Sequence, residues 1–269
     1  MNGVHYLWMI MRNHSFHLVN PRPWPILMSF RLLNAGFGLI YWILTNNFNW
    51  FLCFFFFSTL VVVQWWRDVI REAGYEGARS AQINFIIRAG VILFIVSEIC
   101  FFSSFFWAYF YFRLSPDFSL GMSWPPLGIS VVDYLGIPFL NTIILLGSGF
   151  YITWCHYSIL NFNMMLSKLT LIFCIFLGIY FLLVQLYEYK HISFRFRERT
   201  FGRTFFTLTG FHGFHVLVGL IFIVVNFLRL SSNSFSRCGL LGLEYSIWYW
   251  HFVDLVWLFL YCFVYWWGS

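Results

Sequence analysis

Residues 85–112 read FIIRAGVILFIVSEICFFSSFFWAYFYF and decide the fold class of this chain. The stretch holds only two charged residues, Arg88 near its start and Glu98 at its middle. As an α-helix with a rise of about 1.5 Å per residue it would be about 42 Å long, which crosses the hydrocarbon core and both headgroup layers of a bilayer. We therefore expect a transmembrane helix with one acidic side chain at bilayer depth.

The rest of the chain has the same character. Of its 269 residues, 61% are hydrophobic, 25% aromatic and 10% charged, and the mean hydropathy is +0.75. Soluble domains carry about 25% charged residues, so this composition excludes a soluble domain. Long apolar runs between short polar stretches predict an all-α polytopic membrane protein with seven transmembrane helices. We expect these spans near residues 25–45, 48–66, 85–112, 138–160, 167–189, 204–228 and 242–267.

An odd number of spans places the two termini on opposite faces of the membrane, and the basic residues indicate which face is which. Ten Lys and Arg residues lie on the side of the N-terminus and six on the other, and five of these six crowd into residues 190–203. An excess of Lys and Arg marks the inner side, so we expect the N-terminus there. The formal net charge of +6 fits anionic lipid headgroups better than nucleic acid.

Neither a targeting segment nor a cysteine framework is expected. The first 24 residues contain no apolar run before a small-residue cleavage site, so we expect the mature chain to begin here. The six cysteines form no CxxC pair, and five of them lie in or beside apolar runs. A disulfide framework and a zinc site are therefore not predicted.

Glu98 is the sharpest functional candidate. An ionisable side chain at bilayer depth costs several kcal/mol unless it is paired, protonated or wetted, and it marks a functional site by default. No basic residue lies within one helical turn of Glu98, so desolvation favours its neutral form. Two roles stay open: a structural hydrogen bond to a neighbouring helix, or a direct part in handling protons or lipid.

His212 and His215 are three residues apart and share a helical face. Such a pair could bind a metal or a haem iron, or could hydrogen-bond to helices, water or headgroups. Two ligands do not close a metal site. Further ligands could come from distant residues that a sequence alone does not place nearby, namely Glu188, Glu244, His251 and Asp254.

His251 and Asp254 have the same spacing in the last span. An imidazole and a carboxyl one turn apart can satisfy each other, which removes much of the cost of burial. We expect an internal pair. A proton relay would need further partners reaching both membrane faces, and the sequence shows none.

The stretch QWWRDVIRE that begins at Gln64 predicts a membrane-interface anchor. Trp66 belongs at headgroup depth, where tryptophan is enriched. Arg67 and Arg71, one turn apart, could bind two phosphate oxygens of a lipid while Asp68 and Glu72 neutralise the same face. The alternative is a solvated helix end with no ligand.

The order of these motifs resembles subunit III of the aa3-type cytochrome c oxidases of mitochondria. The resemblance covers nearly the whole chain. It is carried by HLVNPRPWP from residue 17, QWWRDVIRE from 64, ILFIVSE from 92, GFHGFHV from 210, WYWHFVD from 248 and YWWGS from 265. Several aromatic-rich motifs in the same order are more specific evidence of a family than any single motif.

The resemblance implies that the spans are split 2 + 5 around a lipid-filled cleft. Residues 1–269 would then form a single membrane domain. Its parts would be an N-terminal segment (1–24), a two-helix part (25–66), an interface loop (67–84) and a five-helix part (85–269). The resemblance also implies that this chain holds no metal or redox centre, because haem a and copper lie in partner subunits.

The implied function is that of a non-catalytic core subunit of an oxidase in the mitochondrial inner membrane. That oxidase couples cytochrome c oxidation and the reduction of oxygen to water with proton pumping. Subunit I would be the main partner, and subunit II, accessory subunits and a respiratory supercomplex would be further contacts. The N-terminus would face the matrix and the C-terminus the intermembrane space.

The resemblance also assigns roles to particular residues. Glu98 corresponds to the family's carbodiimide-reactive membrane carboxyl. Arg71, Glu72 and Arg229 lie where family members hold phospholipid headgroups, and Trp66 and Arg67 are weaker candidates for the same contact.

Two other functions stay open at this point. A proton-coupled membrane transporter would use Glu98 together with His251 and Asp254 as a relay. Transporters commonly show internal repeats and broken helices, and the sequence shows neither. A membrane haem protein would ligate iron through His212.

Overall fold

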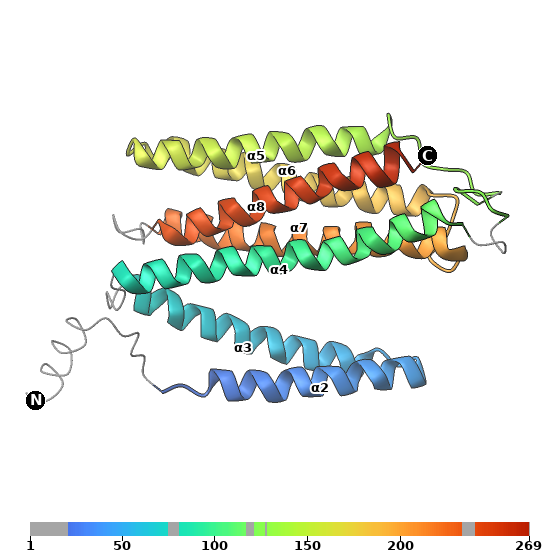
Figure 1. Cartoon of the computed structure of the whole chain (residues 1–269). Helices are drawn as coiled ribbons and strands as arrows, with labels where there is room; N and C mark the ends of the chain where they lie inside the picture. Colours follow the sequence, from blue (N-terminus) through green and yellow to red (C-terminus); the bar gives the residue numbers. More distant parts are fainter. Residues whose placement is uncertain (1–20, 75–80, 117–120, 127, 233–239, 269) are drawn as a thin grey trace, which may run out of the picture. The chain divides into compact units, whose positions relative to one another are not determined.

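The computed structural model describes residues 21–74, 81–116, 121–126, 128–232 and 240–268. Within these residues, seven helices are long and apolar enough to cross a membrane. They are α2 (Trp24–Thr45), α3 (Asn49–Gly74), α4 (Ala81–Leu114), α5 (Ile137–Leu160), α6 (Met164–His191), α7 (Arg199–Ser231) and α8 (Leu241–Leu260), and α8 continues into the π-helix η2 (Tyr261–Trp266) (Figure 1). The predictions of an all-α fold and of seven spans are confirmed.

Several helices run beyond the limits expected from hydropathy, most of all at the end of α3. α3 runs to Gly74 rather than ending at residue 66, and α4 begins at Ala81 rather than at residue 85. Parts of residues 67–84, expected as an interface loop, are therefore helical. The physical reason is that Arg67 and Arg71 lower the hydropathy but are good helix formers, so the apolar run ends before the helix does.

Two compact units make up the chain, Met1–Ile87 and Arg88–Ser269, and their boundary falls within α4. In the first unit, α2 and α3 form a helical hairpin. α2 is followed by Asn46, which has a left-handed backbone (φ 56°) and donates its N–H to the carbonyl oxygen of Trp42. Gly38 allows close approach of α3, because a Cβ there would lie 2.9 Å from the ring of Phe54. The short link between α2 and α3 is thus a turn, and the 2 + 5 arrangement around a cleft stays a prediction.

The helices of the first unit expose large apolar side chains along most of their length. In α2 the buried residue is Gly38. The exposed residues include Ile26, Leu33, Phe37, Ile43 and Leu44 of α2 and Trp50, Phe55, Phe56 and Val63 of α3. So much exposed apolar surface suits contact with lipid tails or with other membrane-embedded chains rather than with water.

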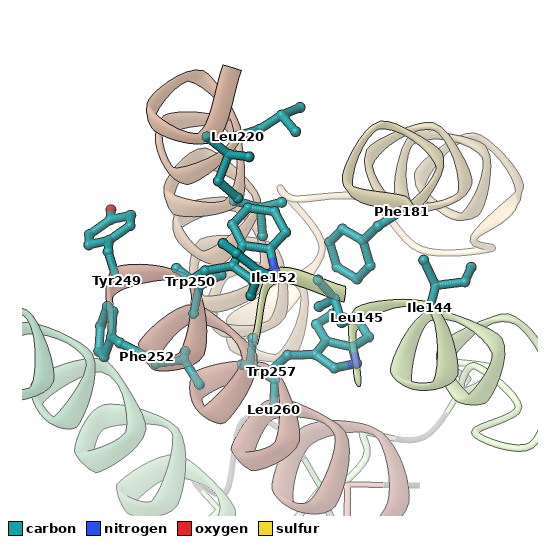
Figure 2. Packing of buried hydrophobic residues seen from close by; sticks show 14 of the residues in the cluster. Ile144, Leu145, Ile152, Phe181, Leu220, Tyr249, Trp250, Phe252, Trp257 and Leu260 are labelled. Carbon is teal, nitrogen blue, oxygen red and sulfur yellow. The ribbon is translucent and has the colours of Figure 1, made fainter. Parts of the chain in front are cut away.

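The second unit has its core around two tryptophans of α8 (Figure 2). Trp250 and Trp257 are 0% and 1% exposed. A buried indole N–H needs an acceptor, and both find one on α5. Trp250 donates to Ser148 Oγ at 2.9 Å, and Trp257 donates to Thr142 Oγ1 at 3.0 Å. These two bonds fix α8 against α5.

Small residues let the neighbouring helices reach Trp250. A Cβ at Gly178 of α6 or at Gly219 of α7 would lie 3.0 Å from the indole ring. Glycine at a helix interface allows backbones to approach closely, as membrane helices require. α6 and α7 therefore pack directly on the ring that α8 supplies.

Candidate functional site

Glu98 is hydrogen-bonded to a histidine from another helix of the second unit. Its Oε2 atom lies 2.8 Å from Nε2 of His215, and the two side chains are 21% and 10% exposed. Glu98 lies at the middle of α4 and His215 on α7. Of the two roles open for Glu98, the structure shows the hydrogen bond to a neighbouring helix.

The other ring nitrogen of His215 determines how many protons the pair holds. Nδ1 lies 2.7 Å from the carbonyl oxygen of Phe211. A carbonyl only accepts, so Nδ1 carries a hydrogen and one further proton lies between Nε2 and the carboxyl of Glu98. The pair is neutral overall whichever group holds that proton. This neutrality lowers the cost of placing a carboxyl at bilayer depth.

His212 has a different environment from His215, although the two share a helix and a spacing of three. It is 1% exposed and lies between aromatic rings, with centroids 5.8 Å from Phe181 and 5.2 Å from Trp257. Neither of its ring nitrogens has a hydrogen-bond partner in the structure as described. The described residues form no group of three or more His, Cys, Asp or Glu side chains that could hold a metal ion.

His251 and Asp254 lie close together without a hydrogen bond between them. Nδ1 of His251 is 3.8 Å from Oδ2 of Asp254, which is within ion-pair range but longer than a hydrogen bond. Nε2 of His251 instead lies 3.1 Å from Oγ1 of Thr153, whose hydroxyl donates to the carbonyl oxygen of Gly149. Thr153 therefore accepts from Nε2, and a neutral His251 has no hydrogen on Nδ1 to offer Asp254.

Asp254 itself is 7% exposed and packs against α5. A Cβ at Gly149 would lie 2.6 Å from its Oδ2 atom. Among the described residues its Oδ1 atom has no hydrogen-bond partner. No hydrogen bond within the described ranges joins Asp254 to the pair of Glu98 and His215.

The predicted interface anchor lies on the last turns of α3, and its acidic residues Asp68 and Glu72 contact Arg22 and Trp24, which the sequence did not identify as their partners. Asp68 accepts a hydrogen bond from the indole N–H of Trp24 at 2.8 Å and lies 4.0 Å from Arg22. Arg22 also pairs with Glu72, and Arg67 pairs with Asp68 at 3.2 Å. The residues before α2 are thus tied to the end of α3.

The remaining side chains of this anchor point outward. Trp66 is 61% exposed, and Arg67 and Arg71 are also exposed. Arg71 makes no ion pair with any residue that the structure describes. Glu72 lies with Arg22 and not with Arg71, so it does not balance the charge that the sequence led us to expect. Both cations face outward, and Arg71 can meet an anionic headgroup without giving up an ion pair to a described residue, whereas Arg67 is paired with Asp68.

Arg229 lies at the end of α7 and is held against the start of α8. Its Nη1 donates to Oδ1 of Asn226 at 3.3 Å, and Asn226 donates to the carbonyl oxygen of Gly242 at 3.3 Å. A Cβ at Gly242 would lie 2.6 Å from Nη1. Glycine at this position therefore makes room for the guanidinium.

Glu244, which the sequence analysis named as a possible further metal ligand, lies in the first turn of α8 and forms an ion pair with Arg88. Arg88 of α4 lies 3.2 Å from it. The guanidinium carbon of Arg88 also lies 6.0 Å from the ring of Trp248. A carboxylate so occupied is not aimed at His212.

A buried polar network joins α5, α6 and η2, and the sequence analysis did not find it. Asn141 donates to Gln185 at 3.1 Å, Gln185 donates to the hydroxyl of Tyr265 at 3.4 Å, and that hydroxyl donates to Glu188 at 2.8 Å. Glu188 is 2% exposed. In the sequence, the sign of this network is Glu188 near the end of an expected span. A glutamate at that place looks the same as one at an ordinary polar helix end, so it did not predict a buried network.

The whole chain can be compared with known proteins. A family model described as cytochrome c oxidase subunit III matches residues 14–269. The curated cytochrome c oxidase subunit 3 of Patiria pectinifera is 46% identical over 256 residues, which covers 95% of this chain and 98% of that protein. The proteins of the same name from Drosophila yakuba and Locusta migratoria are 46% and 45% identical over 257 residues, 96% of this chain and 98% of each relative.

Proposed function

The chain belongs to the cytochrome c oxidase subunit III family and is a multi-pass membrane subunit of that oxidase, within which we propose that it serves as a non-catalytic core subunit. The complex is a translocase of the respiratory chain. On this proposal the chain stabilises subunit I, binds structural phospholipids and supports proton uptake. Haem a and copper are held by partner subunits, and electrons do not pass through this chain.

The observation that carries this proposal is that ionisable residues within the spans contact side chains of neighbouring helices. Glu98 and His215 satisfy each other as a neutral pair, and His251 is hydrogen-bonded to Thr153. His212 lies among aromatic rings. These contacts support a role in holding helices together. A link between Glu98 and proton or lipid handling belongs to the same proposal, since a shared proton sits at bilayer depth there.

Phospholipid binding is supported by the outward cations at the end of α3. We propose that headgroups contact Trp66, Arg67 and Arg71 at the end of α3 and Arg229 at the end of α7. Glu72 contributes by holding Arg22 beside the first of these sites. The exposed apolar side chains of α2 and α3 would lie against acyl chains or partner helices.

The proposed location follows from the family and from the charge asymmetry of the loops. We place the chain in the mitochondrial inner membrane with its N-terminus in the matrix and its C-terminus in the intermembrane space. Subunit I is the main partner, with subunit II and accessory subunits nearby. Contacts within a respiratory supercomplex are part of the same proposal.

Purification of the oxidase in mild detergent tests this function. We expect the chain to migrate with haem a and copper, and we expect a complex depleted of it to keep its haem spectrum while turnover becomes self-inactivating. Loss of the haem spectrum on depletion, because the redox core had lost its own ligands, would contradict a purely supporting role. A Soret band on the isolated chain would contradict it too.

A further inference from the structure

An apolar groove lies where the C-terminal end of α4 meets η2, within the second unit. Its lining includes Trp107, Phe110 and Leu114 of α4 together with Phe263 and Trp267. The groove has a volume of about 630 Å³. Volumes of roughly 300–1,000 Å³ are usual for sites that hold small molecules. The groove is therefore large enough to hold part of a lipid-sized ligand.

A cation lies at the edge of this groove. The guanidinium carbon of Arg113 is 4.0 Å from the centre of the Trp267 ring, which itself lines the groove. Arg113 is partly exposed. No carboxylate of a described residue lies within ion-pair distance of it, whereas Arg22 and Arg88 each pair with one. Among the described residues, the charge of Arg113 therefore has no carboxylate that an outside anion would have to displace.

Buried polar groups hold the inner side of Arg113. The hydroxyl of Tyr109 lies beside Arg113 and beside the ring of Trp124, whose centroid is 5.7 Å from that of Tyr109. Nη1 of Arg113, the Tyr109 hydroxyl and Nε1 of Trp124 are buried and have no hydrogen-bond partner within the described ranges. Tyr109 is 0% exposed. These buried groups are closed to the membrane, so an anion from outside would meet Arg113 through the exposed part of its side chain.

The position of the groove along the helices indicates what kind of anion would occupy it. α4 ends at Leu114 and η2 ends at Trp266, so Arg113 stands at the end of two spans while the groove extends over apolar residues. Arginine, tyrosine and tryptophan at a span end are typical of headgroup depth. A ligand with a negative head and an apolar tail matches both parts.

We propose that this corner binds one anionic phospholipid, with its phosphate on Arg113 and one acyl chain in the groove. The site is separate from the residues proposed above to contact lipid, Trp66, Arg67, Arg71, Glu72 and Arg229. The lipid-site proposal depends on the membrane location of the chain but not on the proposed role in supporting subunit I. If the experiment finds no lipid at this site, the proposed role in supporting subunit I still stands.

Photolabelling of the intact oxidase complex tests the proposal. The complex is incubated with phosphatidylglycerol that carries a diazirine on an acyl chain and is then irradiated, and modified peptides are located by mass spectrometry. We expect labels in residues 107–115 and 262–268, with more label from phosphatidylglycerol than from phosphatidylcholine carrying the same diazirine. Haem a content of each preparation reports whether the complex has assembled.

Three variants separate the charge from the fold. Arg113→Gln should lower labelling by phosphatidylglycerol about fivefold, whereas Arg113→Lys should keep most of it. Leu114→Glu should also lower labelling, because it places a carboxylate beside Arg113 on a side chain that is 71% exposed. Arg195→Gln changes an exposed cation outside the groove lining and serves as the matched control.

Three outcomes would overturn the site. These are equal labelling of the wild type and Arg113→Gln, equal labelling by the two lipids, and a cross-link from the groove peptides to another protein chain in place of lipid. The third would show that a partner helix fills the groove. Should Arg113→Gln fail to assemble, Arg113→Lys and Leu114→Glu decide the question by the same readout.

Discussion

Nε2 of His215 lies 2.8 Å from Oε2 of Glu98, although 117 positions separate the two residues in the chain. The bond crosses from α7 to α4 and leaves a single shared proton between an imidazole and a carboxyl. Such a pair is neutral as a unit, so each member depends on the other for its place in the bilayer. Removing the imidazole and altering the carboxyl should therefore have different effects.

We expect His215→Ala to destabilise the chain by about 1–3 kcal/mol, because it leaves the carboxyl of Glu98 without its partner. Glu98→Gln should cost less, since the glutamine amide can donate to Nε2. The measurement is the thermal midpoint at which this chain leaves the detergent-solubilised oxidase. Leu217→Ala, an exposed position on the same helix, is the control. Equal midpoints for His215→Ala and the control would argue against the pair as a structural contact.

Two glycines on α5 should respond differently to alanine. A Cβ at Gly149 would lie 2.6 Å from Oδ2 of Asp254, whereas a Cβ at Gly147 would meet its nearest neighbour, Leu177, at 3.8 Å. Overpacking of a tight contact costs about 1–3 kcal/mol, so Gly149→Ala should lower the thermal midpoint and Gly147→Ala should not. Adding Asp254→Ala to Gly149→Ala should recover part of the loss. Without such recovery, the contact with Asp254 would not be the cause.

The network around Glu188 should depend on the hydroxyl of Tyr265. That hydroxyl donates to Glu188 and accepts from Gln185, so Tyr265→Phe leaves two buried polar groups without a partner. The expected loss of stability is about 1–3 kcal/mol. Tyr180→Phe removes a hydroxyl from a ring that is 41% exposed and should be nearly neutral. A thermal midpoint for Tyr265→Phe that matches this control would count against the network.

The lipid contact proposed at the end of α3 is tested by its two outward arginines. Each basic residue near an anionic surface contributes about 1 kcal/mol, so Arg67→Ala with Arg71→Ala should lower retained anionic lipid at this site at least about fivefold. Lipid extracted from the purified complex is quantified by mass spectrometry. The paired change of both residues to Lys keeps the charge and should keep the lipid. Unchanged lipid in the double alanine variant would remove these residues from the site.

The fold class could be predicted because it rests on properties that are local in the sequence. An uninterrupted apolar run long enough to cross a bilayer can be recognised without knowing which residues surround it. The positions of the helix ends were harder to predict from the sequence. α3 continues to Gly74 because Arg67 and Arg71 end the apolar run without ending the helix.

For the candidate site, too, the sequence identified some residues but not the contacts that they make. The sequence pointed to Glu98, His215 and Asp254 because polar side chains are rare within spans, yet it gave no means of finding their partners. His212 and His215 look equivalent by spacing, and the fold places one on Glu98 and the other among aromatic rings. Arg22 was visible only as part of a motif, although it holds Glu72.

The sequence by itself determined that this chain crosses the membrane seven times and which few polar residues lie within the spans, because hydropathy and helical periodicity are properties of single segments. Only the tertiary structure decided that Glu98 meets His215, that Asp254 packs on Gly149, and that Arg113 stands at the edge of an apolar groove. The physical reason is that periodicity identifies the residues sharing a helix face, while the partner of that face depends on how distant helices pack.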